Sequence, residues 1–227
     1  ILAVTVSREL NRIPSASLQL DDGEAAKSTF PASNADWFVP GKTIEIQLGY
    51  RSQNTTVFKG TIVKQHLKVR KSGGVLSVDC YAGAVKLTAA RKSKYFVNQK
   101  DSDIVAAVLD EHGLANDVEA TTPDLKEVVQ YDATDWDFIL CRAEANGQVV
   151  AVADDKVAVA KPKLDGAPAL KLNYGATVLE LDVEMDARWQ SKGIKAVSWK
   201  PSDQEAVSAD ASEPTTPTAG NVAAADL

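Results

Sequence analysis

The chain has 227 residues, of which 44% are hydrophobic and 25% are charged, and its formal net charge is −6. This composition is typical of a soluble globular protein with one large or two small domains, and it excludes collagen-like, disulfide-framework and wholly disordered chains. The sequence contains no run of about 20 apolar residues, so it predicts no transmembrane helix. Cys80 and Cys141 each lie in an apolar stretch, and we expect two buried free thiols rather than a disulfide framework.

Residues 1 to about 90 alternate between apolar and polar side chains, which predicts β-strands. In the stretch KTIEIQLGY, for example, Ile44, Ile46 and Leu48 share one face of the expected strand. Gly73 and Gly74 indicate a hairpin turn between two longer strands. We therefore expect antiparallel hairpins with one buried face and one face in water.

The middle of the chain contains two expected helices. For residues 101–114, we expect Asp101 or Ser102 to cap the first turn and Gly113 to end the helix. The second helix begins in TDWDFILCRAEANG, where Thr134 and Asp137 have the spacing of a capping box. A short strand is expected between the helices.

Further strands are expected over residues 148–162, 176–190 and 193–201, and the first of these ranges forms a hairpin. From residue 201 the sequence becomes small, acidic and rich in Pro and Thr, which predicts a linker or tail.

The sequence contains no clear catalytic or metal-binding motif. His66 and His112 have no second ligand at metal-binding spacing. Asp132, Asp135 and Asp137 lie where acids are expected at the start of a helix, so we interpret them as structural. We expect no cofactor and no catalytic residue. The acidic net charge also argues against nucleic acid as a partner, because phosphate binding needs a basic surface.

Two basic clusters allow two interpretations. The first contains Lys64, Lys68, Arg70 and Lys71, and the second is formed by 91–94. Either could be a local patch for an anionic partner. We favour the polar faces of strands, because apolar residues interleave with the first cluster at period two.

Three stretches resemble the VgrG-type spike and phage baseplate hub (late-control) family of contractile injection systems. The first is LNRIPSASLQLDDG with FVPGKTIEIQLGY and VFKGTIVKQHLKVR, the second is EVVQYDATDWDFILCRAEANG, and the third is EMDARWQ with KAVSWKPSDQ. The positions that match the family pattern are Asn11, Pro14, Gly41, Gly49, Tyr50, Gln130, Tyr131, Trp136, Phe138, Arg142, Glu144, Gly147, Asp186, Arg188, Gln190 and Trp199.

The resemblance implies a mainly β (α+β) chain with two tube-protein-like β-barrel domains and a few inserted helices. Residues 1–90 would form the first hub domain, completed by 165–200. Residues 91–164 would form a second, inserted hub domain. Residues 201–227 would be a flexible linker toward an OB-fold and needle.

The resemblance also implies a structural role without enzymatic activity. The family works as a homotrimer that adapts a hexameric tube protein to a threefold needle, with baseplate proteins, a tip protein and effectors as further partners. We expect no stable membrane insertion by this region. The particle would assemble in the cytoplasm and be exported on firing. The sequence does not distinguish a type VI apparatus from an extracellular injection particle or a phage tail.

Two other classes of function remain open from the sequence. A carbohydrate-binding or adhesin β-domain would need a row of exposed aromatic side chains on one face. A tail-associated cell-wall hydrolase would need a convergent pair of carboxylates, and the 31 acidic residues offer no pair to single out.

Overall fold

The computed structural model of the chain describes residues 1–24, 27–51, 53–71, 73–153, 156–163, 166–168, 170–188 and 193–211. The chain divides into two compact units, Ile1–Asp165 and Gly166–Leu227. The prediction of a mainly β chain with a few helices is confirmed.

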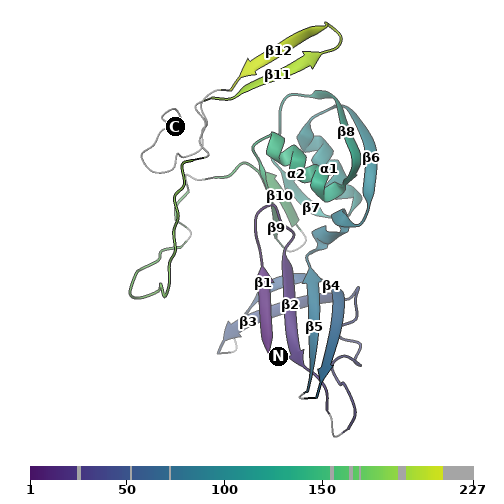
Figure 1. Cartoon of the computed structure of the whole chain (residues 1–227), viewed down its shortest axis with the longest axis vertical. Helices are drawn as coiled ribbons and strands as arrows, with labels where there is room; N and C mark the ends of the chain where they lie inside the picture. The colour runs from purple at the N-terminus through teal and green to yellow at the C-terminus, as the bar shows by residue number, and fades with distance from the viewer. Residues whose placement is uncertain are drawn as a thin grey trace. The chain divides into compact units, whose positions relative to one another are not determined.

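Unit 1 opens with a curled five-stranded antiparallel sheet in the order β1-β2-β5-β4-β3 (Figure 1). Its strands are β1 (Ala3–Ser7), β2 (Ser15–Asp21), β3 (Thr43–Tyr50), β4 (Gln53–Arg70) and β5 (Gly73–Tyr81). The predicted alternation buries one face, where Leu18, Phe58 and Leu76 belong to a single apolar cluster. Irregular pairing beside Ile46 and Ile62 marks bulges, which bend strands and increase their twist.

The rest of unit 1 combines helices with two small sheets. Its elements are η1 (Gly83–Thr88), β6 (Arg91–Gln99), α1 (Asp101–Glu111), β7 (Ala115–Val118), β8 (Leu125–Thr134), α2 (Asp135–Ala145), β9 (Val149–Ala153) and β10 (Lys156–Ala160). One sheet has the order β7-β10-β9, and β6 pairs antiparallel with β8. Apolar residues of η1, both helices, β9 and β10 share one core, which contains Leu87, Leu109 and Ile139.

Asn11 and Pro14 connect the first sheet to this α+β region. The backbone N–H of Asn11 donates to the carbonyl of Val150 at 2.7 Å, and the Val150 N–H donates to Asn11 Oδ1 at 2.8 Å. Asn11 has a φ of 58°, a conformation that asparagine adopts more readily than most residues. The carbonyl of Pro14 accepts from the N–H of Ala82 at 2.9 Å. These motif positions therefore support backbone geometry.

The helix ends agree with the sequence at three of four points. Thr134 caps α2 and accepts from the Asp137 N–H at 3.1 Å. Gly113 and Gly147 follow the two helices with φ of 66° and 65°, as expected of glycine beyond a helix end. The predicted cap of α1 is wrong. Lys100 occupies the N-cap position, and its side chain makes no capping bond. The Asp101 carboxylate does not cap the helix because it accepts from Arg142.

Unit 2 contains one described hairpin, β11 (Lys195–Lys200) with β12 (Glu205–Asp210). Two expectations are wrong here. Residues 179–188 form no strand, and residues 205–210 are a strand rather than part of an irregular linker. A strand forms only with a hydrogen-bonding partner, which periodicity alone does not supply. The proposed completion of the first domain by residues 165–200 stays a prediction.

The two cysteines differ, so the expectation of two buried thiols is half wrong. Cys80 is buried, and Cys141 is exposed on α2. Burial, with a smaller contribution from the Asp79 carboxylate, raises the pKa of Cys80 to about 11.

Candidate interaction surface

The inward face of the two-stranded β6–β8 sheet contributes to a buried ion cluster centred on Asp135. Lys92 Nζ lies 2.6 Å and His112 Nε2 lies 2.7 Å from Asp135 Oδ2, and Gln130 Nε2 donates to Asp135 Oδ1 at 2.9 Å. A carboxylate only accepts, so His112 Nε2 carries its hydrogen toward Asp135. The Asp135 side chain is 2% exposed. The cluster therefore joins β6, α1, β8 and α2.

Asp135, the centre of the cluster, is held as a carboxylate. Burial raises the pKa of the Asp135 carboxyl, but hydrogen bonds from Lys92, Gln130 and His112 together outweigh burial and leave the pKa lowered. Lys94, two residues along β6, bonds both oxygens of Glu111 on α1 at 2.5 and 2.6 Å. The cluster offers its carboxylate to three donors within the protein, so it functions as a structural joint.

A second ion pair fastens α2 to the start of α1. Arg142 donates to both oxygens of Asp101, from Nε at 2.6 Å and from NH2 at 2.8 Å. Asn146 Nδ2 donates to the same carboxylate at 2.9 Å. Burial raises the pKa of Asp101, yet bonds from Arg142 and Asn146 leave it lowered overall. The motif residue Arg142 is thus explained by packing between helices.

The outward face of the same two-stranded sheet carries exposed apolar side chains. Tyr95 is 79% exposed and Tyr131 is 81% exposed, with Val97 at 56% and Val129 at 47%. Tyr95 pairs directly with Val129 across the strands. β6 and β8 lie along one side of the α+β region (Figure 1). A row of tyrosines and valines on one face of a two-stranded sheet is typical of a surface that another protein covers.

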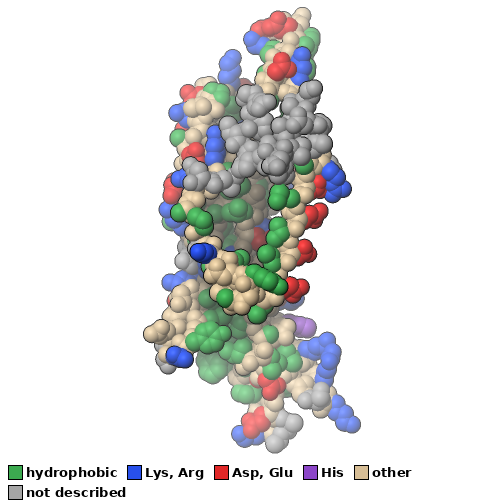
Figure 2. All heavy atoms as spheres, turned by 90° about the vertical axis from the view of Figure 1, so that its left-hand side faces the viewer, with side chains coloured by type: hydrophobic (Ala, Val, Ile, Leu, Met, Phe, Trp, Pro, Cys, Tyr) green, Lys and Arg blue, Asp and Glu red, His purple; other side chains and the backbone are tan. Residues whose placement is uncertain are grey.

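The outward face of the five-stranded sheet is polar instead. Lys64, His66, Lys68 and Arg70 follow one another along β4, opposite Asp79, Ser77, Val75 and Gly73 of β5. Figure 2 shows basic side chains and a histidine gathered near the lower end of the molecule. Lys64 lies 4.0 Å from Asp79. This arrangement agrees with the interpretation of the cluster as the polar face of a strand.

The turn between β3 and β4 presents another exposed tyrosine. Tyr50 is 91% exposed and Leu48 is 47% exposed, although both continue the row that starts with buried Ile46. A Cβ at Gly49 would lie 1.9 Å from the Gln53 carbonyl oxygen, so the close approach of the two strands requires glycine. Gly41 has a φ of 96°, which also favours glycine.

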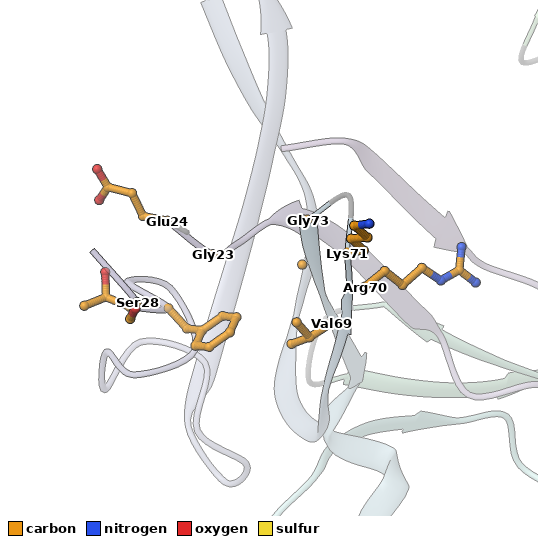
Figure 3. Close-up of a pocket in the computed structure, with 10 residues that line it drawn as sticks. Gly23, Glu24, Ser28, Val69, Arg70, Lys71 and Gly73 are labelled. Atoms are coloured by element: carbon orange, nitrogen blue, oxygen red, sulfur yellow. The ribbon is translucent and has the colours of Figure 1, made fainter. Parts of the chain in front are cut away.

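A hollow of about 310 Å³ lies between the β4–β5 turn and the loop after β2 (Figure 3). Glu24 and Arg70 extend away from it in opposite directions, while Val69 faces it. A small-molecule site needs polar groups that converge on the ligand. The hollow lacks that convergence among its described lining residues.

The remaining motif positions are divided between core and surface. Trp136 and Phe138 are 7% and 6% exposed, and the Phe138 ring stacks on Phe96 with centroids 5.7 Å apart. Glu144 is exposed on α2. In unit 2, Arg188 bonds Asp186 and Trp199 is 60% exposed. Gln190 lies outside the described residues.

The structure brings Gln130 and Asp135 together with Lys92 and His112, which sequence reasoning treated separately. The sequence also did not single out Tyr95 and Val97. Their spacing of two matches that of Val129 and Tyr131, and this shared spacing is the signal that could have found the exposed face.

The described part of the chain contains no group of three or more His, Cys, Asp or Glu side chains able to hold a metal ion. No described helix is long and apolar enough to cross a membrane.

The model of the Alg8 N-terminal domain family matches residues 1–227, and the chain belongs to that family. No curated protein sequence matches it significantly. Solved structures with a similar fold include a tail protein from Neisseria meningitidis MC58, with a TM-score of 0.64 and 14% identity over 95% of this chain and 64% of that one.

Two further structures share the fold. The 43 kDa tail protein of prophage MuSo2 from Shewanella oneidensis gives a TM-score of 0.57 at 13% identity, covering 68% of this chain and 47% of its own. The E. coli c3393 protein gives 0.53 at 17%, covering 70% and 46%. It is described as a component of the type VI secretion system with structural similarity to the T4 tail proteins gp27 and gp5. The chain therefore has a fold found in phage-tail proteins and spans about half to two thirds of their length.

Proposed function

We propose that this chain is the hub portion of a trimeric spike in a contractile injection system. The observation that supports the proposal best is the exposed face of Tyr95, Val97, Val129 and Tyr131 on a fold shared with phage-tail and type VI proteins. Such a face is expected in a protein that assembles with other subunits. The two ion clusters hold the carboxylates of Asp135 and Asp101 inside the fold.

The proposal assigns the chain a symmetry-matching role. Three copies form a ring that contacts a hexameric tube protein on one side and a threefold needle or tip protein on the other, next to baseplate proteins and effectors. Assembly takes place in the cytoplasm, and firing exports the particle. A ring of this kind buries on the order of 2,000 Å² or more in its subunit contacts.

The role is structural, without a nucleotide, a metal or a nucleic acid. Asp101 and Asp135, two of the buried carboxylates in the described part of unit 1, are each held by internal donors. A cell-wall hydrolase would need two carboxyl groups facing a cleft, one with a raised pKa and one that stays ionised. Both pKa values are lowered instead.

Co-assembly with the tube protein of the same genome tests the proposal. Native mass spectrometry of the mixture should show three copies of this chain with six copies of the tube protein. The double variant Tyr95→Ser/Tyr131→Ser should lose that complex while keeping its circular dichroism spectrum. A chain that binds glycans as a monomer and ignores the tube protein would contradict the proposal.

A further inference from the structure

Residues 178–185 of unit 2 read as a strand but do not form one. In this segment Leu179, Leu181, Val183 and Met185 alternate with Glu180, Asp182 and Glu184. Strict alternation over the seven residues 179–185 is the pattern of a strand with one apolar and one charged face. Among the described residues, a single bridge from Val178 to Tyr174 is the segment's only pairing.

The apolar side of this segment is uncovered. Leu179 is fully exposed, and Leu181, Val183 and Met185 are 66%, 69% and 74% exposed. No backbone hydrogen bond joins residues 179–187 to another described residue. An extended segment with this pattern gains a partner by adding to the edge of an existing sheet.

The free edge of β6 matches both faces of the segment. On its outward side β6 carries Tyr95 and Val97, which would extend the apolar side of an added strand. On its inward side Lys92 and Lys94 would face the acidic side. Each lysine has three N–H donors, so each can bond a second carboxylate beside Asp135 or Glu111. Eight residues span about 26 Å, close to the length of the nine-residue β6.

Three other free edges, those of β3, β1 and β8, fit less well. On β3, Glu45 lies on the face opposite the core-facing residues, and its carboxylate would repel the acidic residues of the 178–185 segment. On β1 the outward side carries Ala3, Thr5 and Ser7, with no positive charge. On β8, Glu127 lies on the outward side, where the apolar residues would have to pack.

We propose that residues 178–185 add as a strand to the β6 edge of another copy of this chain. The added strand would turn the two-stranded β6–β8 sheet into three strands, and its leucine, valine and methionine side chains would extend the exposed Tyr–Val face. This inference rests on the self-association in the proposed function, and it specifies which segments make the contact.

Hydrogen–deuterium exchange of the full chain, measured below and above its association midpoint, tests the inference. We expect the amides of 178–185 to exchange at least about 10-fold more slowly in the associated state. Leu181→Asp should raise the dissociation constant at least about 10-fold, because it places a charge in the apolar row beside Tyr95 and Val97. Leu170→Asp is the matched control, since Leu170 is 72% exposed outside the segment, and it should change the constant less than about 2-fold.

The outcomes separate this inference from the proposed function. A trimer that binds the tube protein while residues 178–185 exchange freely overturns the inference and leaves the function standing. Protection that is equally strong in the monomer also overturns it, since the strand would then pair within its own chain. A chain that stays monomeric and unprotected at every concentration contradicts both.

Discussion

The two-stranded β6–β8 sheet and the five-stranded sheet each bury one face, but their outward faces differ. Along β4 the outward residues Lys68 and Arg70 suit contact with water. On the β6–β8 sheet the corresponding places are taken by Tyr95 and Tyr131, about four-fifths exposed. The same period of two thus produces a polar outward surface in one sheet and an exposed apolar one in the other. We therefore expect substitutions on the inward face of β6 and β8 to affect folding, and substitutions on the outward face to affect assembly.

Removing the centre of the inward cluster should have the largest effect. Asp135→Ala removes the carboxylate that accepts hydrogen bonds from Lys92 and His112. It also leaves the buried Gln130 amide without its carboxylate partner. We expect the free energy of unfolding to fall by about 3 kcal/mol, measured by urea denaturation. Glu144→Ala, at an exposed motif position on α2, is the control and should stay within about 0.5 kcal/mol. A loss below about 1 kcal/mol for Asp135→Ala would contradict the structural role of the cluster.

Changing the outward face should affect association far more than folding. Tyr95→Ser/Tyr131→Ser should raise the dissociation constant of self-association about 100-fold, as removal of two interface anchors does. Its free energy of unfolding, measured on the monomer, should change by less than about 1 kcal/mol. Lys68→Ser/Arg70→Ser is the matched pair on the other sheet. Equal weakening by both pairs would abolish the contrast between the two faces.

Acid should destabilise the folded chain by protonating Asp135 and Asp101. The folded-state pKa values of Asp135 and Asp101 are lowered, so their contribution is complete above the unfolded value near 3.8 and is lost as pH falls through the folded value. The midpoint temperature of thermal unfolding should be nearly constant from about pH 7 to 5 and should fall below about pH 4. In the Asp135→Asn variant this fall in the midpoint temperature should be smaller. Stability that increases on acidification through this range would refute the assignment.

Loss of the α2 cap should have a smaller effect. Thr134→Ala removes the oxygen that accepts from the Asp137 N–H, and it should lower the free energy of unfolding by about 1 kcal/mol. Ser102→Ala in α1 should cost less, because Ser102 does not cap its helix. Urea denaturation of both variants measures the difference, and a reversed order would show that the caps are misassigned.

The two cysteines provide the mildest test. In the native protein a thiol reagent should label Cys141 quickly, whereas Cys80, buried with a pKa of about 11, should react only on unfolding. Mass spectrometry of the labelled native chain should therefore show one adduct. Two rapid adducts would mean that the five-stranded sheet opens readily.

The sequence predicted most of unit 1, because its information there is local. Alternation identified β2, β3 and β5, and the Thr134 cap and Gly147 marked the ends of α2. The buried joint at Asp135 escaped prediction, since its donors come from residues 92, 112 and 130, which only the tertiary fold brings together. Residues 179–188 were predicted as a strand and are not one, because alternation reports a strand's faces and not the presence of its partner.

Sedimentation equilibrium of the chain over a wide concentration range tests the central claim most directly. We predict a reversible trimer whose formation depends on Tyr95 and Tyr131. A stable dimer, or a monomer at every concentration with the Tyr–Val face still exposed, would contradict it.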